Sequence, residues 1–244
     1  MIFELILFGA ITGFVSGFFG VGGGMILVPT LLLAGFIMKE AIAISVMQMV
    51  FSSIYGSFLN NRKQSGILVD GILIGIGGFL GGLNSGFIVS FLSNQTLQYI
   101  FILVLAASIF KILSTPAISD KKEKKHSKLL LIIIGIIIGT IAMSIGVGGS
   151  IMLTPILVAF MNYDLKKATS LGLFFVIFSS SAGFISLSYS GHMQYAEGLT
   201  VGIASLFGVY LGIKLKHIIN IKSYKKYVLF LYISTFFMII YKTI

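Results

Sequence analysis

Two stretches of this chain, 126 residues apart, carry the same glycine pattern and decide the fold. They are Gly13-Phe-Val-Ser-Gly-Phe-Phe-Gly-Val-Gly-Gly-Gly-Met-Ile-Leu-Val-Pro29 and Gly139-Thr-Ile-Ala-Met-Ser-Ile-Gly-Val-Gly-Gly-Ser-Ile-Met-Leu-Thr-Pro155. Both contain Gly-Val-Gly-Gly and a later proline, and they align without a gap. The similarity continues at an offset of 127, where Phe51-Ser-Ser53 matches Phe178-Ser-Ser180. Chance similarity between apolar sequences rarely preserves the positions of so many glycine, serine and proline residues. We therefore interpret the chain as an internal duplication.

The composition is that of a membrane protein. Hydrophobic residues make up 57% of the 244 residues and charged residues only 10%, whereas an average soluble domain has about 25% charged residues. The mean hydropathy is +1.07. We therefore predict an all-α polytopic membrane protein with about eight hydrophobic segments, four in each half. The segments are 3–36, 41–60, 67–92 and 96–113, then 129–161, 168–189, 196–216 and 224–241.

The first segment of each half is too long for one straight crossing. Its roughly 33 residues would span about 50 Å as a helix, against a hydrocarbon thickness of about 30 Å. Glycines at Gly20–Gly24 and Gly146–Gly149 lie near the middle of these segments, and each glycine destabilises a helix by about 1 kcal/mol. Both segments should therefore break at their glycines.

The basic residues decide how the segments break. If each long segment crosses once, eight basic residues fall on one side of the membrane and nine on the other, which contradicts the positive-inside rule. If each forms a re-entrant hairpin instead, fifteen fall on one side, and only Lys39 and Lys242 fall on the other. The basic side is then the cytoplasm, and both termini are extracytoplasmic.

Each half then has one glycine-broken hairpin and three transmembrane helices. Because three crossings are an odd number, the second half is inserted upside down, as in the inverted repeats of many secondary transporters. We predict a single membrane transport domain over residues 1–244, with a first repeat at 1–114, a cytoplasmic basic linker at 115–128 and a second repeat at 129–244. The two hairpin tips should face each other across a site.

Such tips suit an anion. A Gly-Val-Gly-Gly turn exposes successive backbone N–H groups, and the helix that leaves it presents its positive N-terminal end. We expect these helices to start near Met25 and Ser150, with Pro29 and Pro155 in or close to their first turns. No Lys or Arg is predicted at midplane depth, so backbone dipoles would supply the positive potential.

Polar side chains at similar depth could complete this cavity, since hydroxyl and amide groups donate hydrogen bonds to anions. Asp70 and Glu197, at equivalent positions near segment ends, could act in gating or proton coupling. The predicted substrate-binding residues are Gly20, Gly22, Gly23, Gly24, Pro29, Gln48, Ser52, Ser53, Gly146, Gly148, Gly149, Ser150, Thr154, Pro155, Ser179 and Ser180.

Simpler interpretations stay open for some of these residues. A serine within a membrane helix often bonds the carbonyl four residues back, which needs no pore. The pairs Gly71/Gly75 and Gly198/Gly202 have the small-xxx-small spacing of packed helices. We expect the three histidines to be solvated in loops or at interfaces.

We expect no enzymatic activity, cofactor or metal. The sequence contains no His-Glu-x-x-His and no Gly-x-Ser-x-Gly motif, and its glycine turn lacks the Lys-Ser/Thr ending of nucleotide-binding loops. The chain has no cysteine, which excludes thiolate metal sites. Its net charge of +10 comes from short basic runs between apolar segments, so we expect no nucleic-acid partner.

On its duplicated motif, its size and its basic central loop, the chain resembles the sulfite exporter TauE/SafE family of membrane transporters. The resemblance covers nearly the whole chain. It implies transport of small sulfur-containing anions such as sulfite, sulfoacetate, sulfolactate or thiosulfate. Ser150 departs from the pattern, because the first copy has Gly24 there. The motif positions that the resemblance carries over are Gly20, Gly22, Gly23, Gly24 and Pro29, with Gly146, Gly148, Gly149 and Pro155.

We thus predict a secondary transporter, an exporter of sulfite, organosulfonates or related sulfur oxyanions, that works by alternating access in a prokaryotic plasma membrane. A proton or sodium ion would be its coupling ion, and a homo-oligomer is left open. Two alternatives also stay open. A passive anion channel would use the same dipoles, and a non-transporting membrane scaffold would need the glycines for stability alone.

Overall fold

The structure is a computed structural model, and it describes residues 2–61, 68–114, 127–163, 165–219 and 221–243. All secondary structure in these ranges is helical. Seven helical spans in these ranges are long and apolar enough to cross a membrane, judged by length and composition, and one of them, Gly71–Phe91, contains a break that is described below. The predicted fold class, an all-α polytopic membrane protein, is confirmed.

The helices divide into two sets that follow the duplication. The first set is α1 (Ile2–Phe19), α2 (Gly24–Leu33), α3 (Met38–Asn61), α4 (Leu68–Gly82), α5 (Ser85–Phe91) and α6 (Asn94–Leu113). The second set is α7 (Lys128–Ser144), α8 (Ser150–Met161), α9 (Leu165–Tyr189), α10 (Tyr195–Ile218) and α11 (Ile221–Thr243). Thus α1 and α2 correspond to α7 and α8, α3 to α9, α4 with α5 to α10, and α6 to α11.

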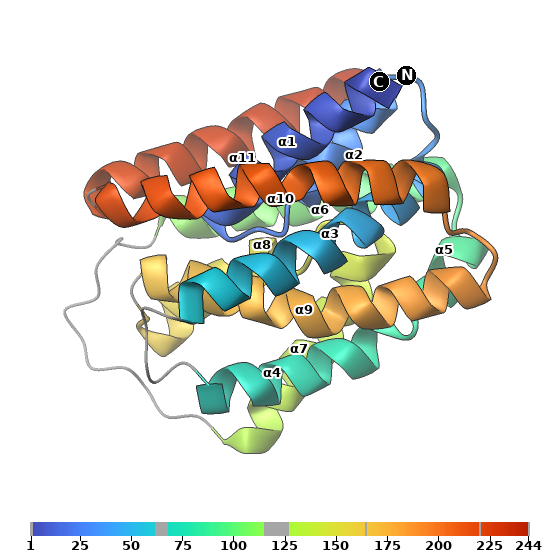
Figure 1. Cartoon of the computed structure of the whole chain (residues 1–244). Coiled ribbons are helices and arrows are strands. Elements are labelled where there is room, and N and C mark those ends of the chain that lie inside the picture. Colours follow the sequence, from blue (N-terminus) through green and yellow to red (C-terminus); the bar gives the residue numbers. More distant parts are fainter. Residues whose placement is uncertain (1, 62–67, 115–126, 164, 220, 244) are drawn as a thin grey trace.

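The two sets exchange partners as inverted repeats do. The first helix of each hairpin packs along a helix of the other set. Thus α1 of the first set lies against α10 of the second, and α7 of the second set lies against α4 of the first. The central helices α3 and α9 pack on each other. In Figure 1, α1 begins and α11 ends on one side of the molecule, here called the termini face. α6 ends and α7 begins on the other side, here called the α6–α7 face.

Glycines allow these exchanged helices to approach closely. A Cβ atom at Gly139 of α7 would lie 2.5 Å from the carbonyl oxygen of Gly78 in α4. On α1, a Cβ at Gly9 would lie 2.5 Å from the carbonyl oxygen of Val201 in α10. Small residues are the usual means of close helix approach in lipid.

The small-xxx-small pairs also serve packing, as predicted. Gly71 and Gly75 receive the rings of Phe174 and Phe178 from α9. At the equivalent places, Gly198 and Gly202 receive Met47 and Phe51 from α3. Since 47 and 51 become 174 and 178 at the repeat offset, one packing motif is used twice.

The predicted segment 67–92 is broken in the structure, whereas its counterpart α10 is continuous. The chain turns at Leu83–Asn84 between α4 and α5. Gly81-Gly82 weakens the helix there, and Ser85 Oγ donates to the Gly82 carbonyl at 2.7 Å. Ser186 of α9 bridges the break: its hydroxyl donates to Leu83 O (2.6 Å) and accepts from Gly86 N (2.9 Å).

The two arms of each hairpin differ in length. The first arms, α1 and α7, have 18 and 17 residues, or about 26 Å each. The second arms, α2 and α8, have 10 and 12 residues. The first arm of each hairpin is therefore nearly as long as a membrane crossing, whereas the second arm is clearly shorter. The first arm reaches past the level at which the two tips meet, and the chain then turns back.

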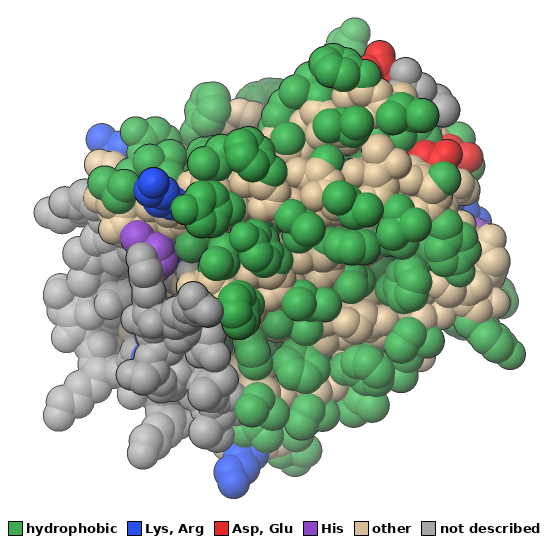
Figure 2. All heavy atoms as spheres, in the orientation of Figure 1, with side chains coloured by type: hydrophobic (Ala, Val, Ile, Leu, Met, Phe, Trp, Pro, Cys, Tyr) green, Lys and Arg blue, Asp and Glu red, His purple; other side chains and the backbone are tan. Residues whose placement is uncertain are grey.

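The charged residues gather at the two faces. Among the described parts of the chain, Lys39 and Lys242 lie near helix ends at the termini face, and the other lysines adjoin helix ends at the α6–α7 face. Figure 2 shows a broad hydrophobic surface between a side with several Lys or Arg side chains and a side with acidic ones. Residues 115–126 of the predicted basic linker 115–128 lie outside the described residues.

Candidate functional site

The glycines of both tips adopt a backbone conformation that other residues rarely take. Gly20, Gly22 and Gly23 have φ values of 68°, 80° and 83°, and Gly146, Gly148 and Gly149 have 70°, 82° and 67°. In this left-handed region an L side chain costs roughly 1–2 kcal/mol. The repeated Gly-x-Gly-Gly spacing therefore encodes one particular turn, used once in each half.

The two tips contact each other directly. A Cβ atom at Gly24 would overlap the carbonyl oxygen of Gly146, and one at Gly148 would lie 3.1 Å from the carbonyl oxygen of Val21. Met49 of α3 packs against both Gly22 and Gly148, as does Val176 at the equivalent position of α9. The prediction that the tips face each other is confirmed. No cavity separates their contacting atoms at these points.

The tips present backbone N–H groups without protein acceptors. α2 starts at Gly24 and α8 at Ser150, and the residue before each helix makes no side-chain cap. Within the described residues, the N–H groups of Gly22, Gly23 and Gly24 form no hydrogen bond to protein atoms, and neither do those of Gly148 and Gly149. Buried N–H groups of this kind are rare, and at a helix N-terminus they favour an anion.

The carbonyl groups at the tips are, by contrast, hydrogen-bonded by hydroxyl groups. Ser52 Oγ donates to Gly22 O at 3.3 Å, and Ser45 Oγ donates to Gly146 O at 2.7 Å. Tyr224 of α11 donates to Phe18 O, at the end of α1, at 2.9 Å. Within the described residues, the protein thus supplies donors to these three carbonyl groups but no acceptors to the five glycine N–H groups named above.

The two prolines lie just past the first turn of their helices, which start at Gly24 and Ser150. Each is the sixth residue of its helix, so it removes a hydrogen bond to the carbonyl four residues earlier. For Pro155 that carbonyl belongs to Ile151, and Tyr232 of α11 donates to it at 3.2 Å. A tyrosine of α11 therefore replaces the donor that the proline removes.

Gln48 is the most unusual polar residue beside the tips. Its side chain is 0% exposed, and a Cβ at Gly23 would lie 2.6 Å from Oε1 and 2.8 Å from Nε2. Neither atom has a hydrogen-bond partner within the described residues. Burying an unpaired amide costs roughly 1–3 kcal/mol, so this side chain is expected to bind a water or a ligand.

Three hydroxyl groups of the predicted site are also buried without a hydrogen-bond partner among the described residues. They belong to Ser150, Thr154 and Ser180. Ser150 and Thr154 both lie against Gly172 of α9. The hydroxyl groups of Ser53 and Ser179 instead donate to backbone carbonyl groups of their own helices. Their polarity at this depth therefore needs no ligand to explain it.

The two halves differ at the tips. At the repeat offset Gln48 corresponds to Phe175, whose ring contacts Gly149 in the way that the amide contacts Gly23. One tip therefore faces an amide and the other a phenyl ring. Sequence reasoning missed Phe175, and it missed Ser45 as well. Because Ser45 shares a helix face with Gln48 and Ser52 at spacings of three and four residues, the helical period could have found it.

The two residues predicted to act in gating belong to the first turns of their helices, away from the tips. Asp70 is in the first turn of α4, and Glu197 is in the first turn of α10. These turns lie at the α6–α7 face and the termini face respectively. Among the described residues, no three His, Asp or Glu side chains gather into a metal-binding group.

Two of the histidines lie in described parts of the chain. His192, in the loop before α10, hydrogen-bonds Ser90 at 3.0 Å, and burial with nearby Lys39 lowers its pKa. His217 is in the last turn of α10. His126 lies outside the described residues.

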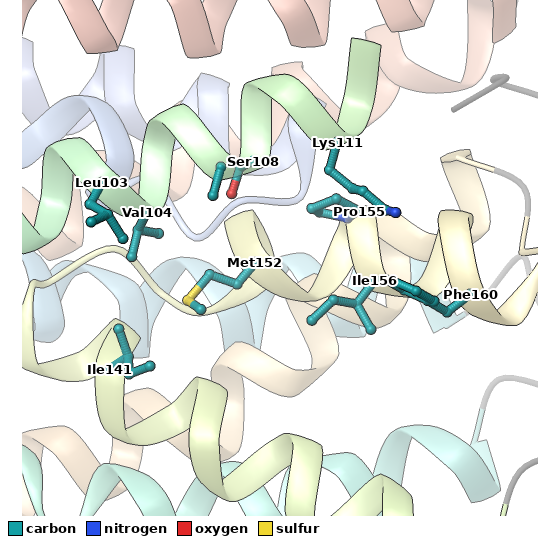
Figure 3. Close-up of a pocket in the computed structure, with 10 residues that line it drawn as sticks. Leu103, Val104, Ser108, Lys111, Ile141, Met152, Pro155, Ile156 and Phe160 are labelled. Carbon is teal, nitrogen blue, oxygen red and sulfur yellow. The ribbon is translucent and has the colours of Figure 1, made fainter. Parts of the chain in front are cut away.

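A separate apolar groove of about 340 Å³ runs between α6, α7 and α8 (Figure 3). It reaches Pro155 and Met152 but not the glycines of the tips. At one end the Lys111 Nζ atom lies 4.3 Å from the centre of the Phe160 ring. Apart from Ser108 and Lys111 its lining is apolar, and it does not include Gln48.

Opposed broken hairpins, inverted repeats and long apolar helices together define a multi-pass membrane transport protein. The chain belongs to the sulfite exporter TauE/SafE family, whose model matches residues 5–239.

Its relatives are transporters by name. It is 28% identical to "Probable membrane transporter protein MJ0441" of Methanocaldococcus jannaschii, over 89% of this chain and 87% of the relative. It is 22% identical to "Probable membrane transporter protein YunE" of Bacillus subtilis, over 85% and 86%. A "Probable membrane transporter protein" of Haemophilus influenzae is 27% identical over 76% and 73%.

Proposed function

We propose that this protein is a secondary transporter that exports small anions, with sulfite, organosulfonates and related sulfur oxyanions as its substrate class. The family name supports the sulfur chemistry. The observation that carries the proposal is the pair of opposed tips, where helix N-termini and unpaired N–H groups lie beside the buried Gln48 amide.

The tips would bind the anion through backbone N–H groups, and Gln48, Ser150, Thr154 and Ser180 would donate further hydrogen bonds. Each of these four side chains has a polar group without a partner among the residues that the structure describes. Binding would therefore recover free energy that the empty protein gives up by burying them. Ser45, Ser52 and Tyr224 would hold the tips in place through their carbonyl groups.

Direct contact between the tips favours a carrier over a passive channel. Every residue from Phe18 to Met25 is buried, as is every residue from Ala142 to Ser150, so no open path runs between the contacting tips. In alternating access, one repeat would move against the other and open the site to each face in turn. The charge asymmetry supports a cytoplasmic α6–α7 face and extracytoplasmic termini.

Counterflow in proteoliposomes tests this function. Vesicles that contain unlabelled sulfite should take up labelled sulfite faster than empty vesicles, because a carrier exchanges its substrate across the membrane. Gly23→Leu should abolish this exchange, since the new side chain would meet the Gln48 amide. Gly191→Leu is the matched control, because Gly191 has φ 72° and no neighbour within 4 Å of a Cβ atom. Equal exchange in wild type and Gly23→Leu would contradict the proposal.

A further inference from the structure

The apolar groove between α6, α7 and α8 has the length and the charge of a lipid site (Figure 3). We propose that it binds one acyl chain of an anionic phospholipid from the leaflet at the α6–α7 face, with the lipid phosphate at Lys111. Because Met152 and Pro155 of α8 line the groove, this lipid would pack against the short arm of the second hairpin.

The length of the groove matches one leaflet. The steps from Leu103 to Lys111 on α6 and from Met152 to Phe160 on α8 each rise about 12 Å. The hydrocarbon core of a bilayer is about 30 Å thick, so one leaflet contributes about 15 Å. Lys111 and Phe160 both lie in the last turns of their helices. The groove thus runs from the membrane interface inward to about the bilayer centre, as an acyl chain does.

The charge of the groove lies at its interfacial end. Figure 3 places Lys111 and Phe160 at one end and Leu103 at the other. The Lys111 Nζ atom lies 4.3 Å from the centre of the Phe160 ring, which favours an ammonium group at the mouth of the groove. Among the described residues that line the groove, none is acidic. A phosphate at the mouth would therefore meet a cation, while the chain below it would meet apolar side chains.

The groove is open to the surroundings of the protein. The span that contains α6 is one of the two least buried of the candidate membrane spans. The side chains of Leu103 and Phe160, which line the groove, are 69% and 55% exposed. In a multi-pass membrane protein, apolar side chains that are exposed between the ends of the spans are solvated by lipid.

The charges near the mouth favour a phospholipid over a second copy of this chain. Lys111, Lys128 and Lys167 all lie near helix ends at the α6–α7 face. A second copy inserted in the same direction would bring the same lysines to the same level, where like charges repel each other. An anionic headgroup complements these lysines instead.

Tryptophan fluorescence tests the proposal in the full-length chain, which has no tryptophan of its own. Phe160→Trp places a reporter in the groove. Phe207→Trp is the matched control, because Phe207 is near the middle of α10 and 68% exposed. The vesicles contain phosphatidylcholine and phosphatidylglycerol, with bromine on the acyl chains of one lipid at a time, and bromine quenches a tryptophan that it contacts. We expect about a fivefold preference for phosphatidylglycerol in Phe160→Trp, as for one lysine beside an anionic lipid, and no preference in Phe207→Trp.

Two further substitutions in the Phe160→Trp background separate the headgroup from the chain. Lys111→Met should reduce the preference to about one, whereas Lys242→Met, at the termini face, should leave it unchanged. Ala107→Phe should fill the groove and reduce quenching by either lipid. Ala106→Phe is its control, because Ala106 is exposed on the same helix and does not line the groove.

The possible results decide the proposal without a transport assay, so they are independent of the proposed function. Equal quenching by the two lipids in Phe160→Trp, or a preference that survives Lys111→Met, would overturn the lipid site. Quenching by neither lipid in Phe160→Trp, together with quenching by both in Phe207→Trp, would overturn it as well. The groove would then be covered by a second copy or by another part of the chain.

Discussion

Gly24, at the start of α2, packs directly against the carbonyl group of Gly146 at the tip of the other hairpin. The same residue touches the hydroxyl of Ser45, and that hydroxyl donates to the Gly146 carbonyl at 2.7 Å. Three residues from three helical units thus meet without space for one more carbon atom. The two hairpins are therefore held together at their tips as well as through α3 and α9.

The first prediction tests this contact. Gly24→Ala should destabilise the protein by about 1–3 kcal/mol and abolish transport, because the methyl group must push the hairpins apart. Gly183→Ala is the control, since its Cβ would meet the flexible side chain of Met143 at 3.1 Å. Unfolding in detergent and counterflow measure both effects. Wild-type stability and exchange in Gly24→Ala would show that the tips are not packed in this way.

The second prediction separates backbone strain from function. Gly22→Ala and Gly191→Ala both place alanine at a positive φ, 80° and 72°, so each should lose roughly 1–2 kcal/mol of stability. Only Gly22→Ala should also lose exchange, because Gly22 lies between Met49 and Val176 at the tip contact. An equal loss of exchange in both variants would assign the tip glycines to stability alone.

The third prediction concerns Gln48. Gln48→Met has a similar volume and no unpaired amide, so the ligand-free protein should gain about 1–3 kcal/mol of stability. The same variant should lose the thermal stabilisation that anions give to the wild type, which is about 2.7 kcal/mol at 100 times the dissociation constant. Gln95→Met is the control, since Gln95 is exposed and bonds Tyr99. A less stable Gln48→Met that still responds to anions would make Gln48 a structural residue.

The fourth prediction is a double-mutant cycle between α11 and α8. Tyr232→Phe should cost about 1–3 kcal/mol, because it leaves the Ile151 carbonyl buried without a donor. In a Pro155→Ala background the backbone N–H returns, and the same substitution should cost clearly less. Chemical denaturation of the four proteins gives the coupling energy. Additive effects would mean that the tyrosine does not replace the lost helix bond.

Much of the fold could be predicted from the sequence, because lipid leaves few choices. The lengths of the hydrophobic segments predicted most helix ends to within a few residues, and the two groups of glycines located both hairpin tips. The break before Ser85 was missed, although Gly81-Gly82 and Asn84 were visible. It depends on Ser186, which is more than 100 residues away in the chain and compensates the lost helix bonds.

The site was harder to predict than the fold. Sequence reasoning found Gln48 and the glycines from depth and repetition. It could not see that Ser53 and Ser179 bond their own helices while Ser180 does not, since both choices fit the same pattern. The roles of Tyr224 and Tyr232 depend on contacts between distant segments, which a single sequence does not reveal.

The most direct test of the re-entrant hairpins is accessibility of single cysteines, for which a chain without cysteine is well suited. Phe3→Cys and Ile37→Cys flank the first hairpin, and Ser127→Cys and Lys167→Cys flank the second. An impermeant thiol reagent should label the first two from the outside of intact cells and the last two only from the inside. Labelling of Phe3→Cys and Ile37→Cys from opposite sides of the membrane would contradict the account.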